Sequence, residues 1–470
     1  MSVKIGLEIH CQLTTLRTKL FCPCSSDYRD KEPNQLVCPV CFGVPGTLPV
    51  LNARAVEYAI RIGAALNCKT ASETSFYRKN YFYPDLPKGF QISQYDKAGG
   101  MPIAYDGYVQ LERKKFRVRR IQLEEDPGKL TYEGTIEKSS YSLVDYNRAG
   151  IALVEIVTEP DFESAKEAKV FLEKLRSTVE ALGVSDGELE GAMRCDANVS
   201  VDEGGRVEIK NISSFKEVEK ALNYEILRQS TFTKSSDNHV NETRHWDERR
   251  SITISLRLKE GEQDYRYFPE PDLPAVVLSE EFVERVRVET PEVPEARANR
   301  YVRDYSLTAQ VAMELSRNAA LSRLFEETVA IHRNGPDVAN WITGESRAEV
   351  QKTLMGPGRE TLPRRLAELL AMISQGKMTR VQAKEVFRGM LAKGESASSL
   401  AGQVGGVVTD EVVIGEIVGR VLRESGAEEA RTNPKAFNYL VGQVLRAERR
   451  ADPRVVAKLL RQKLEPGDNS

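Results

Sequence analysis

Three stretches in the first 260 residues alternate between apolar and polar side chains, which is the pattern of a β-strand with one buried face. They are VKIGLEIHCQL at 3–13, RCDANVSV at 194–201 and ITISLRLK from residue 252. In the first stretch, Glu8 and His10 fall together on the polar face. The pattern predicts strands with an apolar core on one side and polar groups on the other.

Between these strands, apolar residues recur at intervals of three and four, which predicts helices. The clearest helix runs from Ser164 to Leu182, with Ser164 and Glu167 as a capping box and Gly183 at the C-cap. Its apolar stripe consists of Ala168, Phe171, Leu172, Leu175, Val179 and Leu182. Residues 1–290 are therefore predicted to be α+β, with strands predominating.

The pattern changes at TPEVPE, 290–295, where two prolines and two glutamates indicate a linker. Beyond it the apolar spacing is helical, with a break at KGESASS, 393–399. Asn433-Pro434 and Asp452-Pro453 each predict the start of a helix. We expect three domains: a strand-rich α+β domain at 1–292, an all-α helical domain at 293–400 and a small all-α tail domain at 405–470.

Composition excludes several classes of protein. The chain has 470 residues, of which 41% are hydrophobic and 29% charged, so it is neither disordered nor fibrous. No apolar run approaches the roughly 18 residues of a membrane span, and MSVKIGLEIH lacks the pattern of a secretory signal. The net charge is −2, so affinity for nucleic acid would have to come from a local basic patch.

Four of the seven cysteines fall in FCPC and VCPVC, with thirteen residues between Cys24 and Cys38. Thiolates bind Zn²⁺ tetrahedrally, so these four predict a closed structural zinc site, and the alternative is a set of reduced cysteines without metal. The other three, Cys11, Cys68 and Cys195, are isolated. An odd number of cysteines and no signal predict a reducing, cytoplasmic location. The predicted zinc ligands are Cys22, Cys24, Cys38 and Cys41.

Acidic residues and one histidine form the second candidate site. Glu8 and His10 share a strand face, IQLEEDPGK at 121–129 is strongly acidic, and Glu155 stands between apolar residues in LVEIV. A buried carboxylate is costly unless it is paired or binds a metal, and carboxylates with one histidine suit Mg²⁺ or Mn²⁺. The alternatives are a solvated acidic face and a Glu–Arg pair. The candidate catalytic residues are Glu8, His10, Glu124, Glu125 and Glu155.

The run RKNYFYPDLPKGFQISQYD, 78–96, interleaves basic and aromatic residues. Such a segment can hold a phosphate and stack on a base, although a proline-rich loop packed by its aromatic residues has the same composition. The candidate nucleotide- or substrate-binding residues are Arg78, Lys79, Tyr81 and Lys88.

The tail is basic: from Arg431 to Lys463 there are nine basic residues and two acidic ones. A short helical unit with this charge suits phosphate binding, and the alternative is a solvated helix face. The sequence contains no Walker loop and no G-x-S-x-G motif. The candidate phosphate-binding residues, which would contact a nucleic acid, are Arg446, Arg449, Arg450, Lys458 and Arg461.

The ordered motifs resemble one family. GLEIHCQL, KLFCPC, VCPVCFGVPGTLPVLN, RKNYFYPDLPKGFQISQ, LEEDPGK, SLVDYNRAG, LVEIVTEPDF, RCDANVSV, EIKNISSF and DYRYFPEPDLP occur in this order. Together they resemble the B subunit of the tRNA-dependent aspartyl/glutamyl amidotransferase, over essentially the whole chain and most densely from Ile5 to Pro274. The resemblance implies a strand-rich cradle domain with an embedded zinc knuckle, then a helical domain and a small helical tail that reaches tRNA.

The resemblance also implies an activity. Proteins of this family bind mischarged Asp-tRNA(Asn) or Glu-tRNA(Gln), activate the side-chain carboxylate with ATP and Mg²⁺, and amidate it. Ammonia comes from a glutaminase A subunit, a small C subunit supports the pair, and the enzyme is a carbon–nitrogen ligase. The family's Mg²⁺ site maps to His10, Glu125 and Glu155, with Glu8 and Glu124 beside it. Which of the two adjacent glutamates binds the metal stays open, since neighbours on a strand point to opposite faces.

Two residues depart from the family pattern: Gln122 stands where His is frequent, and Pro127 where Ala is frequent. The competing interpretation is a non-catalytic, zinc-containing tRNA-binding adaptor, which has no use for Glu155 in an apolar strand. A metallohydrolase is a third, but the chain lacks a compact ligand motif such as H-E-x-x-H. The sequence does not distinguish Asp-tRNA(Asn) from Glu-tRNA(Gln) as substrate.

Overall fold

A computed structural model of the chain describes residues 2–97, 99–111, 113–132, 139–202, 204–232, 241–258, 265–344, 346–425 and 433–464. It divides into two compact units, Met1–Val293 and Pro294–Ser470. The boundary lies within the linker predicted at TPEVPE, between α5 (Glu280–Glu289) and α6 (Pro294–Tyr305).

In the first unit, twelve strands of the described residues form one sheet, in the order β14-β13-β12-β11-β1-β10-β7-β5-β4-β15, with β6 beside β7 and β2 beside β6. The strands are β1 (Val3–Gln12), β2 (Lys69–Thr70), β4 (Phe76–Asn80), β5 (Phe90–Gln94), β6 (Ala104–Leu111), β7 (Lys114–Glu125), β10 (Ala152–Thr158), β11 (Met193–Val201), β12 (Val207–Lys210), β13 (Glu242–Asp247), β14 (Ile252–Leu258) and β15 (Phe268–Pro269). Two small pairs accompany it: β3 (Glu73–Thr74) with β16 (Val276–Val277), and β8 (Lys129–Tyr132) with β9 (Ser142–Asp145).

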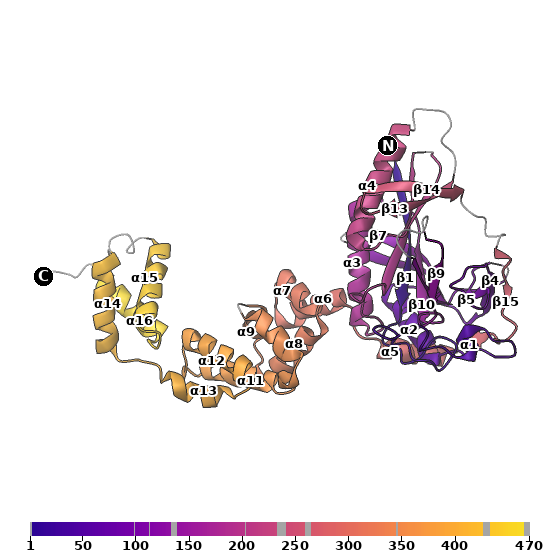
Figure 1. Ribbon diagram of the computed structural model, residues 1–470. Coiled ribbons are helices and arrows are strands. Elements are labelled where there is room, and N and C mark those ends of the chain that lie inside the picture. The colour runs from indigo at the N-terminus through magenta and orange to yellow at the C-terminus, as the bar shows by residue number, and fades with distance from the viewer. Residues whose placement is uncertain are drawn as a thin grey trace. The chain divides into compact units, whose positions relative to one another are not determined.

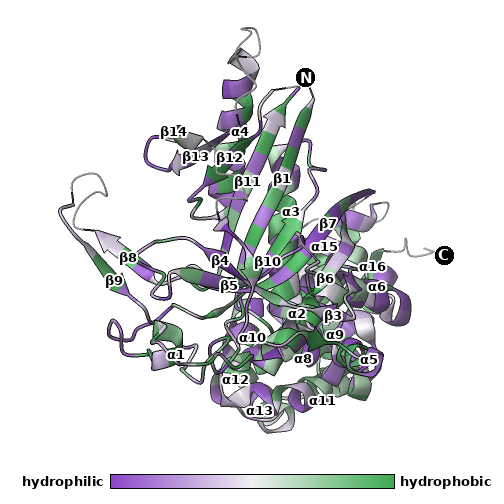
Figure 2. Ribbon diagram, turned by 90° about the vertical axis from the view of Figure 1, so that its right-hand side faces the viewer, coloured by the Kyte–Doolittle hydropathy of each residue, from purple (hydrophilic) through white to green (hydrophobic). Residues whose placement is uncertain are grey.

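The middle of the sheet, β11-β1-β10-β7, is antiparallel throughout. The predicted alternation is present: Ile5, Leu7 and Ile9 of β1 are at most 1% exposed, whereas Glu8 and His10 are half-buried. Figure 2 shows apolar and polar bands following one another along β1 and β11. The sheet therefore has an apolar face toward the core and a polar face that is free to hold a site.

Helices cover the apolar face. The first unit contains α1 (Pro39–Phe42), α2 (Ala53–Ala65), α3 (Ala165–Ala181), α4 (Phe215–Phe232) and α5. Buried residues of α2, α3 and α4 join those of the central strands in one hydrophobic cluster, and α3 and α4 lie along the sheet in Figure 1. The α3 capping prediction is half confirmed: Ser164 accepts from the Glu167 amide, but the Glu167 carboxylate accepts from the Glu163 amide rather than from that of Ser164.

The second unit is helical in its described residues, apart from an isolated bridge between Val408 and Ala451. It contains α6, α7 (Ala309–Ser316), α8 (Ala319–His332), α9 (Gly335–Thr343), α10 (Arg347–Leu354), a 3₁₀ turn (Pro357–Arg359), α11 (Leu362–Ser374), α12 (Arg380–Lys393), α13 (Ala397–Val404), α14 (Glu411–Ser425), α15 (Pro434–Ala447) and α16 (Pro453–Leu464). Helices α15 and α16 begin at the two prolines singled out in the sequence.

This unit has two hydrophobic clusters that share no residue. One extends from Ala298 to Leu400 and the other from Ile414 to Leu464. The break predicted at 393–399 is short, because α13 begins at Ala397 and packs Leu400 into the first cluster. We propose that the two clusters mark separate domains, 293–400 and 405–470. Among the residues described, no helix is long and apolar enough to cross a bilayer.

Candidate functional site

Three acidic residues and one histidine converge on the polar face of the sheet. His10 of β1 pairs in register with Glu155 of β10, and Leu153 of β10 pairs with Glu124 of β7. His10 Nε2 lies 3.7 Å from Glu8 Oε1 and 3.6 Å from Glu124 Oε1. Four side chains from three neighbouring strands thus meet at one point because of strand register and alternation.

The spacing of these side chains fits a divalent cation. One donor atom each from Glu8, His10 and Glu155 can be chosen so that all lie within 4.8 Å of one another. Donors of an octahedral cation at roughly 2.1 Å are about 3 Å apart when adjacent and about 4 Å when opposite. Oxygen donors with a single imidazole suit Mg²⁺ or Mn²⁺, so the residues present fit the metal that the resemblance implies.

The electrostatics of the cluster also favour an added cation. Burial, followed by the charge of Glu8, raises the pKa of both Glu124 and Glu155 to about 7. Burial acts in the same direction on Glu8, but His10 and nearby cations outweigh it and lower its pKa. Two carboxyls of the cluster are therefore hard to ionise together without a further positive charge.

Cations that the sequence did not single out surround the cluster. Arg120 donates to Glu155 at 3.3 Å and to Asp96 at 3.2 Å, and Lys210 Nζ lies 2.8 Å from Asp196. Alternation along β7 was the available signal, because it places Arg120 on the same face as Glu124. No comparable signal indicated Lys210, whose strand reaches the site only through long-range pairing.

Glu125 does not join the cluster. It points to the opposite face of β7, where its carboxylate accepts from Lys88 Nζ at 2.6 Å and from the Ile92 amide at 3.0 Å. Of the two adjacent glutamates between which the sequence left the choice open, Glu124 therefore lies beside His10, and Glu125, expected there with His10 and Glu155, lies on the opposite face. The physical reason is strand alternation, which sends adjacent side chains to opposite faces.

The four candidate substrate-binding residues divide between the same two faces. Lys79 lies on the cluster side, with Nζ 4.9 Å from the centroid of the Tyr265 ring. Burial opposes its charge, but Tyr81 and the cluster carboxylates outweigh burial and raise the pKa of Lys79. Lys79 and Tyr81 thus lie beside the cluster carboxylates, whereas the other two residues do not.

Arg78 and Lys88 lie with Glu125 on the other side. Arg78 bonds Glu270 through two nitrogens, at 2.7 and 2.8 Å, and Asp272 at 3.2 Å. Arg78 and Lys88 line a cavity of ≈ 200 Å³ together with residues 43–47, which follow the last of the four clustered cysteines. Arg78 is held by two carboxylates, so its contacts are those of a structural ion pair.

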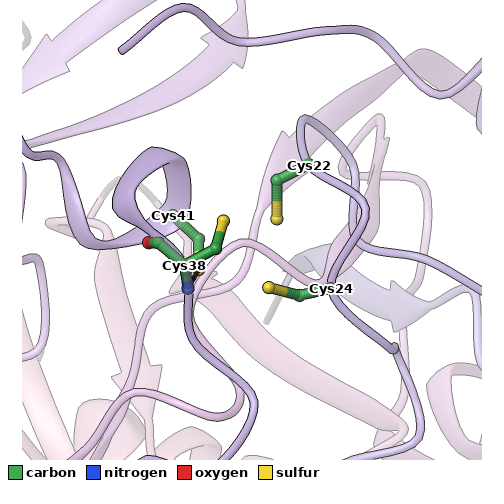
Figure 3. Close-up of side chains that lie close together, drawn as sticks. All are labelled: Cys22, Cys24, Cys38 and Cys41. Carbon is green, nitrogen blue, oxygen red and sulfur yellow. Dashed lines mark hydrogen bonds between the residues drawn. The ribbon is translucent and has the colours of Figure 1, made fainter. Parts of the chain in front are cut away.

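The four predicted zinc ligands come together. Cys22 and Cys24 stand on one loop, and Cys38 and Cys41 flank the start of α1, with sulfur atoms turned toward the space between them (Figure 3). Their sulfur atoms lie within 4.8 Å of one another. Tetrahedral Zn–S bonds of roughly 2.3 Å place sulfur atoms about 3.8 Å apart, so the residues present fit zinc.

The thiols differ in acidity. The hydrogen bond between Cys22 and Cys41 lowers the pKa of Cys41 to about 4 and, together with burial, raises that of Cys22. Burial raises the pKa of Cys24 to about 11. Ionisation of one thiol thus opposes ionisation of the other three. Four thiolates can coexist at this site when a divalent cation such as Zn²⁺ binds them.

The comparison with protein families is decisive. Residues 3–284, which hold both clusters, match the family described as the GatB/GatE catalytic domain. The chain belongs to the GatB/GatE family. Residues 323–464 match a second family, described as the GatB domain. The resemblance seen in the ordered motifs is confirmed.

Full-length relatives agree with this assignment. A protein of Saccharolobus solfataricus is 46% identical over 468 residues, covering 98% of this chain and 99% of the relative. Proteins of Thermotoga maritima and Thermodesulfovibrio yellowstonii are each 43% identical, over 479 and 477 residues, and cover 98% and 97% of this chain and 98% of each relative. All three are named as the B subunit of aspartyl/glutamyl-tRNA(Asn/Gln) amidotransferase.

The two departures from the GatB pattern have contacts of their own. Gln122 donates to the Gln94 carbonyl and accepts from Arg120, so it lies within the polar network of β7. The Pro127 carbonyl accepts from Arg148 Nε at 2.8 Å. Both residues take part in hydrogen bonds beside the site, and neither displaces a member of the cluster.

In the tail, the candidate tRNA-binding residues are all exposed. Arg446 and Arg449 line an open groove of ≈ 850 Å³ together with Lys384 and Arg388 of α12. The last two were not identified from the sequence, although they are four residues apart and thus share a helix face. Three of the five candidates have side-chain contacts nearby: Arg450 bonds Glu448, Lys458 bonds Glu411 and Arg461 lies over Phe437.

Proposed function

We propose that this chain is the tRNA-binding and amidating subunit of an Asp/Glu-tRNA(Asn/Gln) amidotransferase, an ATP-dependent carbon–nitrogen ligase. The convergence of Glu8, His10, Glu124 and Glu155 on one face of the sheet carries the proposal. A tRNA-binding adaptor would have no need to bury Glu124 and Glu155, which are only 4% and 8% exposed, beside other carboxylates. The names of the full-length relatives support the same function.

The chemistry explains why such a cluster is required. The side-chain carboxylate of Asp-tRNA or Glu-tRNA is a poor electrophile, so amidation near neutral pH first needs an acyl phosphate. Mg²⁺, held by Glu8, His10, Glu124 and Glu155, would orient the phosphates of ATP and neutralise developing charge. Lys79 and Arg120 border the same carboxylates and offer positive charge to phosphate oxygens. The lysine is preorganised for this by its contact with the Tyr265 ring.

Other chains supply the remaining parts. The sequence contains no glutaminase motif, so we propose that ammonia comes from an amidase-type A subunit, with a small C subunit completing the enzyme. The exposed basic residues of the tail bind the tRNA substrate. Since tRNA and reduced cysteines are both cytoplasmic, we expect the enzyme there.

The function is tested by ATP hydrolysis in the assembled enzyme. We expect ADP release to depend on Asp-tRNA(Asn) or Glu-tRNA(Gln), with Asn-tRNA(Asn) and Gln-tRNA(Gln) as controls that lack a free side-chain carboxylate. Amidation of the same tRNAs is measured in parallel. Binding of mischarged tRNA without ATP consumption would replace this proposal with the adaptor.

We also propose a structural zinc ion at Cys22, Cys24, Cys38 and Cys41. Protein purified under reducing conditions should contain one zinc per chain, and Cys41→Ser should contain almost none. Zinc present at a thousand times its Kd stabilises a fold by about 4 kcal/mol, so the variant's Tm should fall by roughly 10 °C.

Cys68→Ala is the matched control, because Cys68 is a buried cysteine outside the cluster. Its zinc content should equal that of the unchanged protein. Elemental analysis that found no zinc in the unchanged protein would remove the metal from this site.

A further inference from the structure

Lys19 is fully buried, with an exposure of 0%, and stands next to the four-cysteine cluster. Its Nζ donates to the Leu36 carbonyl at 2.8 Å and to the Tyr146 carbonyl at 3.4 Å, and lies 3.6 Å from Cys41 Sγ. Within the described part of the chain, no carboxylate lies within ion-pair distance of this ammonium. A buried lysine that contacts only carbonyls and a thiol needs an explanation.

The explanation lies in charge. An ammonium buried without a counter-ion costs several kcal/mol, and two carbonyl oxygens do not supply a compensating charge. Four thiolates around one Zn²⁺ carry a net charge of −2, which is equally costly to bury. Lys19 touches this cluster, so each group offers the charge that the other lacks.

We propose that Lys19 is a positioning residue of the zinc site, whose ammonium donates an N–H···S hydrogen bond to the Cys41 thiolate and offsets part of the cluster's negative charge. The inference rests on the zinc site proposed above. Outer groups that hydrogen-bond metal ligands orient those ligands and set how firmly the metal is held.

The backbone around Lys19 favours this role. The Lys19 amide donates to the Cys24 carbonyl at 2.9 Å, so Lys19 is fixed to the loop that carries the first two cysteines. Its Nζ reaches Leu36, two residues before Cys38, on the segment that carries the other two. Lys19 therefore joins the two halves of the knuckle on the side of Cys41.

The third contact joins the knuckle to the catalytic sheet. Tyr146 precedes Gly150, whose φ is +82° and whose absent Cβ would lie 3.5 Å from Cys41 Cβ and 3.6 Å from Lys19 Cδ. The Gly150 amide donates to the Asp126 carbonyl at 2.9 Å, next to Glu125. The lysine thus fills the space between the zinc ligands and the loop that leads into β10.

The test compares Lys19→Met with Lys31→Met in the full chain. Lys31 is an exposed lysine in the same segment, so its replacement controls for loss of one positive charge. Transfer of zinc to a chromogenic chelator measures retention. We expect Lys19→Met to lose zinc 10- to 100-fold faster, the usual effect of removing such a group, and Lys31→Met to match the unchanged protein.

A second measurement separates this role from simple capping of the Leu36 and Tyr146 carbonyls. Tm is measured for each protein with zinc and after zinc removal. If Lys19 acts through the zinc-bound thiolates, Lys19→Met should lower Tm more with zinc bound than after zinc removal, because only the zinc-loaded site keeps all four thiols ionised. Lys19→Gln, which keeps an N–H donor without the charge, should behave like Lys19→Met.

Three results would overturn the proposal. The first is a fall in Tm on Lys19→Met that is equal with zinc bound and after zinc removal. The second is a rate of zinc release that Lys19→Met does not change. The third is the absence of zinc from the unchanged protein. The last would remove the zinc site as well, whereas the first two would leave the zinc site in place and reject only the role of Lys19.

Discussion

Replacing Glu155 with Gln should reduce tRNA-dependent ATP hydrolysis and amidation at least about 100-fold, while the partner's glutaminase stays active. The carboxylate of Glu155 is buried beside Glu8 and Glu124 and has a raised pKa of about 7. An amide of the same shape keeps the packing but removes a charged donor for the cation. In the proposed function, phosphoryl transfer depends on that cation, whereas glutamine hydrolysis takes place on the A subunit.

The adjacent residues Glu124 and Glu125 provide the matched control. Glu124→Gln should reproduce the defect and weaken Mg²⁺ binding. Glu125→Gln removes the ion pair with Lys88 on the opposite face, so Mg²⁺ affinity should stay near that of the unchanged enzyme. Mg²⁺ titrations of ATP hydrolysis distinguish the two variants. Weaker Mg²⁺ binding by Glu125→Gln with Glu124→Gln unaffected would restore Glu125 to the metal site.

Deleting residues from 405 onward should weaken binding of mischarged tRNA by about tenfold or more, with a smaller effect on the chemical step. Each phosphate contact releases counterions and contributes about 0.9 to the slope of log K against log salt. Loss of contacts from Arg446, Arg449 and Arg461 should therefore flatten the slope by about 2 to 3. Filter-binding or fluorescence titrations over a range of salt concentrations measure both quantities.

Charge-neutral variants refine this test without removing a domain. Arg446→Gln with Arg449→Gln changes two exposed arginines that line the groove with α12. Arg450→Gln with Lys458→Gln is the matched pair, because those side chains bond Glu448 and Glu411. We expect the Arg446/Arg449 variant to lose more affinity for tRNA, and more of the salt dependence of that affinity, than the Arg450/Lys458 variant. If the truncated enzyme bound tRNA with unchanged affinity and an unchanged slope of log K against log salt, the tail would be a solvated helical face with no role in tRNA binding.

The sequence predicted the parts of the fold that depend on local pattern. The alternation of β1 and β11, the helix at α3 and the proline-initiated helices α15 and α16 all follow from residues close together in the chain. The cysteine quartet was also predictable, because its two halves lie within twenty residues. These features can be predicted without knowing which strands, distant in the sequence, pair with one another.

The sequence could not predict the arrangement that depends on strand order. Whether Glu124 or Glu125 faces His10 is decided by the register of β7 against β10 and β1, which are far apart in sequence. Lys210 reaches the site because β12 pairs with β11, and nothing near it in the chain indicates this. Lys19 appeared as one more basic residue in a loop, although it is among the most buried side chains of the molecule.

The separate hydrophobic clusters have a consequence for how the protein melts. The described cores of the cradle, the helical region and the tail share no buried residue, so the loss of one does not by itself remove packing from the others. Cooperative unfolding extends only as far as a continuous core. Calorimetry should therefore resolve more than one transition, and stripping zinc should shift only the transition of the cradle. The Tm followed in the zinc experiments is therefore that of the cradle transition, and one melting temperature for the whole chain would misstate the stability of the other parts.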